Sequence, residues 1–452
     1  MIQAVRMPPG PGTDWAAEFA RHEREILRRE PDELLALRRA ALRRFLATGY
    51  PTRREEAWRY ADLAAIARTA FTLPAGRPPR RAAEEVLARA LLPGAVPLVF
   101  VDGGYAGGAS GPAAPVGVEV ANLAGRPAEA ARAETRIAGI LAADDRPFVA
   151  LNTAFFGDGA LVRVRRGAHV EIPIQILFVA SGGEKPLAIH PRVLLVLEEG
   201  ARATVVESFA GASAVRLTNA VTEVRLGRGA ILDRYYVQDE GAQALHVHSF
   251  AAELAGGAAL RSHGFALGSA LSRAEIDVEF AGPEGEAVLG GLWAVDGDRH
   301  ADCRTFVDHG VPHCTSEQAF RGILGGAGRG VFQGRVRMRE GARGSRARQA
   351  TRSLLLSRAA RADTKPELEI RNDDVQCSHG ATVGQLDEEP PFYLRSRGID
   401  APAARAMLAL GFARAVLDDI RVPALAARIE GALQRWLGDR LSGAGIPEEG
   451  AP

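Results

Sequence analysis

The segment with the clearest chemical potential is Asp374-Val-Gln-Cys377-Ser-His379-Gly. Cys377 and His379 stand two residues apart, so in an extended backbone both side chains point to the same side. A thiolate and an imidazole are competent ligands for iron or an iron–sulfur cluster. The pair cannot complete even one tetrahedral iron, so other ligands must come from another subunit, from Cys303 or from Cys314. A Cys–His catalytic dyad is less favoured, because side chains two apart run parallel; a buried Cys beside a hydrogen-bonded His is the alternative without chemistry.

A denser cluster of possible ligands lies in the stretch HADCRTFVDHGVPHC, and it contains His300, Asp302, Cys303, Asp308, His309, His313 and Cys314. Imidazole, thiolate and carboxylate together can bind zinc or iron. However, ten residues separate the two cysteines, which fits neither a zinc finger nor a zinc ribbon. We therefore favour a role in structural packing for this stretch.

Two further motifs offer weaker chemistry. His246-Val-His248 followed by Glu253 imitates the first metal motif of cupin oxygenases, but Gly241 is one residue too close and no later segment supplies the fourth ligand. We expect two surface histidines on a strand instead. The glycine-rich run 325–330 lacks the Lys and Ser/Thr of a phosphate-binding loop, so we expect a tightly packed turn. If the protein takes part in an ATP-driven process, another chain hydrolyses the ATP.

The central part of the sequence, which contains all these residues, has the pattern of short strands. Gly-Ala pairs at residues 167, 200, 229 and 257 lie 33, 29 and 28 residues apart, and Gly285 follows 28 residues later. No helical pattern of ten or more residues intervenes, so a βαβ sheet is disfavoured. Short strands repeating at this period, with Gly at the corners, predict a β-solenoid. A β-sandwich is the alternative.

Helical periodicity is confined to the two flanks. We predict helices within residues 14–66, over 82–92, and over 403–420 with Asp400 as N-cap and Pro402 in the first turn. A last helix begins at Pro423, and it carries an apolar stripe that indicates core packing, or alternatively a partner-binding face: Leu425, Ile429, Leu433, Trp436 and Leu437. The expected regions are N-terminal helices (1–92), an uncertain connection (93–147), the β core (148–384), C-terminal helices (385–442) and a disordered tail (443–452).

Composition excludes several classes of protein. The 452 residues contain 56 basic and 55 acidic side chains, which argues against a nucleic-acid wrapper and against a polybasic membrane binder. Three cysteines cannot form a disulfide framework, and they favour a reducing cytoplasm. We find no segment of signal-peptide or membrane-helix type, so we expect a cytoplasmic protein without membrane or nucleic-acid partners.

Several long stretches resemble the SufB/SufD family of iron–sulfur assembly proteins. They are PTRREEAWRYADL (51–63), LNTAFFGDGALVRVRRG (151–167), TFVDHGVPHCTSEQAFRGIL (305–324), GRGVFQGRVRM (328–338) and ADTKPELEIRNDDVQCSHGATVGQLDEEPPFYLRSRGI (362–399). The CSHGATVGQLDEE portion is similar to the SufD version of the family pattern, whereas the SufB version is EHEAT-like.

This resemblance implies a mainly β fold, namely a right-handed parallel β-helix core flanked by N- and C-terminal α-helical regions. It also implies a non-catalytic scaffold subunit that pairs with a SufB-like subunit and carries a SufC-like ABC ATPase on its C-terminal helices. His379, with Cys377 as its neighbour, would then be a ligand of a transient iron–sulfur cluster at the subunit interface. No cofactor bound tightly to the isolated chain is expected, and a homodimer is possible when the partner is absent. The alternative is a β-helical or cupin-like metal-dependent enzyme.

Overall fold

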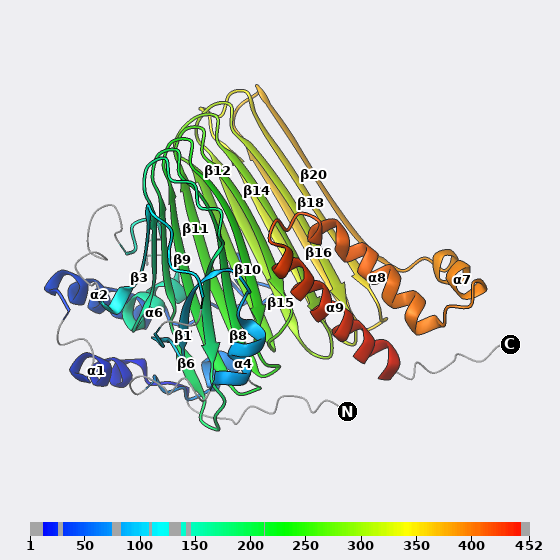
Figure 1. Ribbon diagram of the computed structural model, residues 1–452, viewed down its shortest axis with the longest axis horizontal. Helices are drawn as coiled ribbons and strands as arrows, with labels where there is room; N and C mark the ends of the chain where they lie inside the picture. Colours follow the sequence, from blue (N-terminus) through cyan, green and yellow to red (C-terminus); the bar gives the residue numbers. More distant parts are fainter. Residues whose placement is uncertain are drawn as a thin grey trace.

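The computed structural model describes residues 12–25, 30–74, 83–107, 111–125, 137–141, 146–211 and 213–443. Its centre is a parallel β-solenoid with helices at both ends of the chain (Figure 1). This confirms the predicted mainly β fold with helical flanks, and the β-sandwich alternative is wrong because nearly all neighbouring strands run parallel. The predicted tail lies outside the described residues, except for Gly443, the last residue of a helix.

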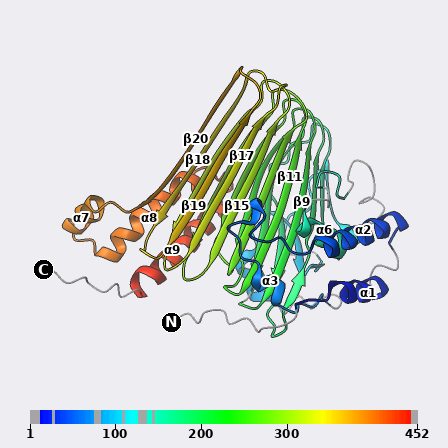
Figure 2. The same cartoon turned by 180° about the vertical axis from the view of Figure 1, so that it is seen from behind.

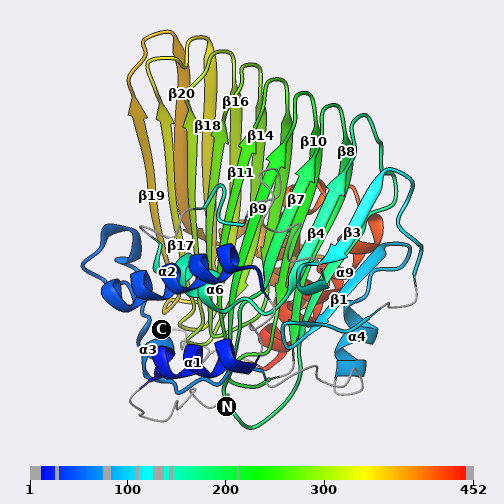
Figure 3. The ribbon, with the colours of Figure 1, turned by 90° about the vertical axis from the view of Figure 1, so that its left-hand side faces the viewer.

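The solenoid consists of two long sheets. Sheet I contains, in spatial order, β2 (Gly104–Tyr105), β1 (Val96–Val101), β5 (Ile174–Ala180), β8 (Arg202–Gly211), β10 (Ile231–Asp239), β12 (Ala259–Ala266), β14 (Glu286–Val295), β16 (Thr315–Leu324), β18 (Ser345–Leu355) and β20 (Val375–Gln385). Sheet II contains β19 (Arg361–Ile370), β17 (Arg329–Met338), β15 (His300–His309), β13 (Leu271–Phe280), β11 (Ala244–Leu254), β9 (Arg216–Leu226), β7 (Arg192–Leu197), β4 (Gly159–Val164) and β3 (Val118–Asn122), while β6 (Leu187–Ile189) pairs with β9. Figure 3 shows β19 and β20 at one end of the stack and β1 and β3 at the other.

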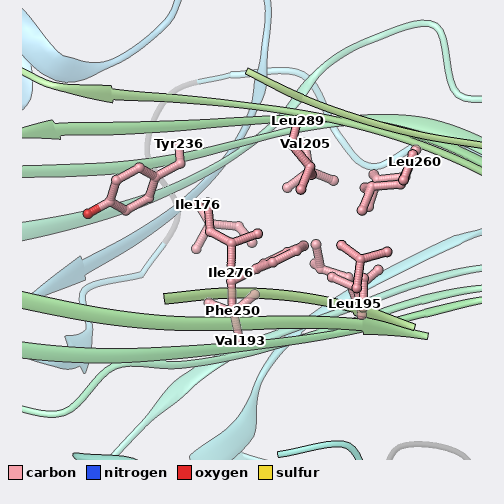
Figure 4. Packing of buried hydrophobic residues seen from close by; sticks show 14 of the residues in the cluster. Ile176, Val193, Leu195, Val205, Tyr236, Phe250, Leu260, Ile276 and Leu289 are labelled. Atoms are coloured by element: carbon pink, nitrogen blue, oxygen red, sulfur yellow. The ribbon is translucent and has the colours of Figure 1, made fainter. Parts of the chain in front are cut away.

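Each coil of the solenoid contributes one strand to each sheet. Ladder partners in sheet I, such as Ile231 with Ala259 and Thr315 with Arg346, are 28 and 31 residues apart in sequence. Because side chains alternate along a strand, one face of each sheet points into the solenoid and the other points outward. Figure 4 shows apolar side chains such as Val205, Leu260 and Phe250 meeting between the sheets.

One corner of the solenoid is built from residues with left-handed backbone conformation. They stack from coil to coil with φ between 59° and 69°, and they are Gly167, Gly200, Gly229, Gly257, Glu284, His313 and Gly344. The N–H of each donates to a carbonyl of the next coil, as Gly200 does to Arg228 at 2.9 Å. The predicted corner at Gly285 is wrong by one residue, because Glu284 occupies the left-handed position.

N-terminal helices cover the outer face of sheet II (Figure 2). They are α1 (Trp15–Glu25), α2 (Asp32–Thr48), the 3-10 helix η2 (Glu56–Trp58), α3 (Ala64–Arg68) and α6 (Pro147–Phe155), whereas α4 (Glu84–Ala90) packs on sheet I. Trp58 links these helices to the sheet, since its ring stacks on Phe148 with 5.3 Å between centroids and lies 3.7 Å from the guanidinium carbon of Arg273. Strands β1 to β3 and the 3-10 helix η4 (Leu123–Gly125) lie within the connecting region 93–147.

C-terminal helices cover the outer face of sheet I (Figure 1). The covering helices are α8 (Ala401–Leu417) and α9 (Pro423–Gly443), whereas α7 (Glu389–Ser396) precedes them and buries none of its residues. The predicted N-cap is confirmed, because Asp400 Oδ1 accepts from the Ala403 N–H at 2.7 Å, although the helix begins two residues earlier than predicted. Leu425, Ile429 and Leu433 are buried against the sheet, so the core interpretation of the α9 stripe is confirmed. None of the helices in the described part of the chain is long and apolar enough to span a membrane.

Candidate functional site

Cys377 and His379 lie on β20, the last strand of sheet I. Their ladder partners on β18 are Ala347 and Gln349, which are buried in the interior of the solenoid with exposures of 4% and 1%. Since parallel strands in register place equivalent side chains on one face, Cys377 and His379 continue this interior row. The structure thus places both side chains on the same side of the strand, as their spacing predicts.

The final coil is open to solvent because no further coil of the described chain stacks on it (Figure 3). We call the exposed surface of β19 and β20 the open end. His379 is exposed there, whereas Cys377 is half-buried beside Val336, Met338 and Ala347. Burial raises the pKa of the Cys377 thiol above its ordinary value of 9.0. The thiol is therefore protonated at neutral pH until a metal or a new neighbour stabilises the thiolate.

The other two cysteines do not reach this pair. Cys314 lies two strands away in the ladder and two residues further back, which places it about 12 Å from Cys377. Its sulfur lies 3.6 Å from the carbonyl oxygens of Gly282 and Pro312. Cys303 lies in the solenoid interior, where it lines a cavity of about 40 Å³ with Arg234 and Tyr236. Among the residues that the structure describes, no three His, Cys, Asp or Glu side chains are grouped to hold a metal.

The candidate ligands between His300 and Cys314 are dispersed over both faces of the solenoid. Asp302 and Asp308 point outward, and Asp308 accepts from Arg339 at 2.6 Å. His309 points inward, with its Nε2 2.8 Å from Ser316 Oγ. His313 and Cys314 occupy the corner positions that Gly and Ala hold in earlier coils, since His313 has a φ of 59° and Cys314 is fully buried. The structural interpretation of this stretch therefore holds.

His246 and His248 are not surface residues, and that prediction is wrong. Both are buried inside the solenoid, where His246 Nδ1 lies 2.6 Å from Glu240 Oε2 and His248 Nε2 lies 3.2 Å from Thr222 Oγ1. Burial, reinforced by the nearby Arg234 guanidinium, lowers the pKa of His248 well below 6.5. Glu253 projects from the other face and pairs with Arg225 at 3.7 Å. The three residues of the cupin-like motif are therefore not brought together.

Residues 325–328 of the glycine-rich run form the turn between β16 and β17, as expected from the sequence, and residues 329 and 330 begin β17. Gly326 has a φ of 56°, and a Cβ on it would lie 2.6 Å from the backbone nitrogen of Gly297. A Cβ on Gly328 would lie 2.9 Å from the carbonyl oxygen of Val295. These glycines serve the close stacking of successive turns.

Sequence reasoning missed a row of buried polar side chains behind His379. Gln349 and Gln318 are ladder partners on β18 and β16, and Gln318 Oε1 accepts from Thr305 Oγ1 at 2.6 Å. A signal for this row exists in the β18 sequence SRARQATRS, where exposed arginines alternate with Ala347, Gln349, Thr351 and Ser353. The alternation assigns the polar residues between the arginines to the interior.

Comparison with known proteins gives a consistent result over most of the chain. The family described as "SUF system FeS cluster assembly, SufBD core domain" matches residues 178–412, and the "SufBD protein N-terminal region" matches residues 12–176. The chain is 32% identical to "Iron-sulfur cluster assembly protein SufD" of Escherichia coli (strain K12), over 89% of this chain and 92% of that protein. It is 28% identical to "Protein ABCI7, chloroplastic" of Arabidopsis thaliana, over 92% of this chain and 89% of the relative.

Proposed function

The chain belongs to the SufB/SufD family of iron–sulfur cluster assembly proteins, and we propose that it is a SufD-like scaffold subunit that lends ligands to a nascent cluster. One observation carries this proposal: His379 and Cys377 project together from the last strand of the solenoid, at its open end. Two donors leave an iron site incomplete, so the remaining ligands must come from a second chain. The protein's part is then to present ligands, not to catalyse a reaction of its own.

A ligand set divided between two chains suits a scaffold that must release its product. A cluster held by four thiolates of one fold is stable and hard to transfer, whereas ligands on two chains separate when one chain moves. A neutral imidazole at position 379 also leaves the cluster less negative than a fourth thiolate would. Such a cluster is a transient cargo, formed at the subunit interface and passed on.

The second chain in this proposal is a SufB-like subunit that docks on the open end. Several features of this surface support such a partner. The outer edges of β19 and β20 pair with no other strand among the residues that the structure describes, and unpaired strand edges are templates for pairing with another chain. Ile370 and Val383 add apolar side chains there, with exposures of 48% and 42%. A second copy of this chain could pair through the same surface when the SufB-like partner is absent.

A SufC-like ABC ATPase is the third component, and we place it on the C-terminal helices. The apolar stripe of α9 is already buried against sheet I, so it is not available to a partner. Phe392 and Tyr393 on α7 and Met407 on α8 are exposed instead, by 71%, 57% and 52%. Figures 1 and 2 show α7 extending away from the solenoid, where a partner can reach it. ATP hydrolysis then belongs to the partner chain.

Replacement of His379 by Ala tests the ligand role. In a complex reconstituted with the SufB-like and SufC-like partners, we expect normal assembly but at least about a tenfold loss of cluster formation, because the cluster loses a ligand. Cluster formation is measured by visible absorbance and Mössbauer spectroscopy. His169→Ala is the matched control, because His169 is exposed at the opposite end of the solenoid.

Two outcomes contradict the proposal. One is an unchanged cluster yield in the His379→Ala complex. The other is a purified chain that, on its own, holds stoichiometric iron or zinc and turns over a substrate, which would favour the metal-dependent enzyme. Metal analysis of the isolated chain detects the second outcome.

A further inference from the structure

His379 has a buried amide directly behind it. In the sheet I ladder its partner on β18 is Gln349, and the partner of Gln349 on β16 is Gln318. Neighbouring strands lie about 4.8 Å apart, so equivalent side chains on one face are within reach of each other. Gln349 and Gln318 are each 1% exposed, and they belong to the row of buried polar side chains in this part of the interior.

The side chain of Gln349 has a dedicated space. Across the interior, Gly334 of β17 faces it, and a Cβ at Gly334 would lie 1.9 Å from Gln349 Nε2. Any residue other than glycine would therefore displace the amide. Gln349 Nε2 points to Gln318 Oε1 at 3.4 Å, and Gln318 is itself fixed by Thr305.

The carbonyl oxygen of the Gln349 amide has no hydrogen-bond partner within the described part of the chain. This oxygen, Oε1, is buried. Leaving a buried carbonyl without a donor is costly, so such groups usually have a specific partner. With Nε2 directed at β16, the free carbonyl is available to the neighbour on the opposite side, β20, which carries the imidazole of His379.

We propose that Gln349 is a positioning residue for His379. In this proposal Gln349 Oε1, which has no partner within the described residues, accepts a hydrogen bond from one imidazole N–H when the His379 ring turns toward it, and this bond fixes the tautomer and orientation of the ring. The second ring nitrogen is then deprotonated and directed toward the open end. A histidine that binds a metal commonly has its other N–H held by an acceptor in this way. This inference rests on the proposed function, because it assigns the free nitrogen to the cluster.

Tautomer measurement on the full chain tests the contact without any cluster. We would label the protein with ¹⁵N-histidine, record long-range ¹H–¹⁵N spectra at about pH 8.5, where ordinary histidines are neutral, and assign His379 by its absence in His379→Ala. We expect one tautomer of His379 to dominate in the wild type. In Gln349→Leu, the ratio of the two tautomers should shift at least threefold toward the ratio of free histidine. Thr351→Val is the matched control, because Thr351 is an equally buried polar residue of β18 whose hydroxyl makes no hydrogen bond in the described part of the chain, so its loss should leave the ratio unchanged.

A conservative variant separates positioning from packing. Gln349→Glu retains the acceptor oxygen, so it should keep the wild-type tautomer even where Gln349→Leu folds poorly. In the reconstituted complex, cluster yield should fall in Gln349→Leu and recover in Gln349→Glu. An equal tautomer ratio in the wild type and Gln349→Leu would overturn the inference. Failure of His379→Ala to affect cluster formation would instead overturn the proposed function, so the two failures are distinguishable.

Discussion

Single residues of this protein take their roles from their position in a coil. His313 and Cys314 have the chemistry of metal ligands, yet they replace the Gly-Ala pair of the solenoid corner, one with left-handed backbone and the other with a small buried side chain. Cys377 and His379 have similar chemistry, but they lie on a coil with nothing stacked beyond it. Availability to a partner, more than residue type, distinguishes the two pairs.

Buried histidines make the stability of the fold dependent on pH. Burial lowers the pKa of His190 and of His22 from 6.5 to about 3, and that of His309 to about 4. Below pH 6.5 the unfolded chain binds protons at these sites and the folded chain does not. The free energy of unfolding should therefore be fully maintained above pH 6.5 and fall by up to about 1.4 kcal/mol per pH unit for each histidine on acidification. Urea midpoints at pH 7.5 and 5.5 measure this loss.

His190→Leu provides the comparison for this prediction. The variant loses the contact between His190 Nδ1 and Asn219 Nδ2, which is 3.2 Å long in the wild type, and should be less stable at both pH values. The loss between pH 7.5 and 5.5, however, should be smaller by about 1 kcal/mol, because one proton-binding site of the unfolded chain is gone. An identical pH dependence in the two proteins would contradict the assignment.

At the scale of elements, the two helical flanks differ in what they leave exposed. The N-terminal helices bury their aromatic residues against sheet II, and η2 adds an ion pair between Glu56 and Lys365 of β19. The C-terminal helices α8 and α9 are equally well packed on sheet I, but α7 has no buried residue. A helix that buries none of its residues in its own chain is a reasonable surface for another chain.

The double substitution Phe392→Ser and Tyr393→Ser tests α7 as the docking surface of the ATPase. We expect affinity for the SufC-like ATPase to fall by about tenfold or more, since exposed aromatic residues are common anchors of interfaces. The stability of the isolated chain should change by less than about 0.5 kcal/mol, because both side chains are exposed. Titration calorimetry and thermal unfolding measure the two effects.

Leu46→Ser is the control for this substitution, because Leu46 is an apolar residue on α2 with 50% exposure and lies on the other flank. Equal ATPase affinity in the double variant and the control would exclude α7 as the docking surface.

Elements whose ends are determined by neighbouring residues could be predicted from the sequence. Asp400 caps α8 and the Gly-Ala pairs turn the early corners because both effects act within a few residues. The later corners at Glu284 and His313 could not be recognised, since the stacking of coils imposes the left-handed conformation on residues that do not favour it. Local signals therefore identified the solenoid but not its complete register.

At the scale of the whole molecule, the two ends of the solenoid are unequal. At one end, β2 pairs antiparallel with β1 and β3 pairs antiparallel with β4, whereas at the other end β19 and β20 have outer edges that pair with no strand in the described part of the chain. The candidate site could be predicted as a pair of residues from the spacing of Cys377 and His379. Its setting could not, because the open end depends on how many coils stack, and the alternation in β18 does not show that Gln349 lies beside His379. For the same reason His246 and His248 were assigned to the surface, since alternation does not tell which face of a strand is covered.

Pairing of isolated chains through the open end is the prediction that belongs to this scale. At concentrations of tens of micromolar we expect a wild-type dimer in sedimentation velocity, because free edges and exposed Ile370 and Val383 favour association. The double variant Ile370→Lys and Val383→Lys should be monomeric, because the charges cannot be buried between two chains. Leu46→Lys should remain dimeric. A monomeric wild type, or a dimeric double variant, would contradict the role of this surface.

The regular stacking of coils fixes the distances between features that lie on different strands of the solenoid. The C-terminal helices lie on the middle strands of sheet I, and the candidate ligands lie on its last strand. Adding or removing one coil between them would change their separation in steps of about 4.8 Å, without altering the local structure of either. In the proposed complex, the distance from an ATPase on these helices to a cluster at the open end is therefore set in whole coils.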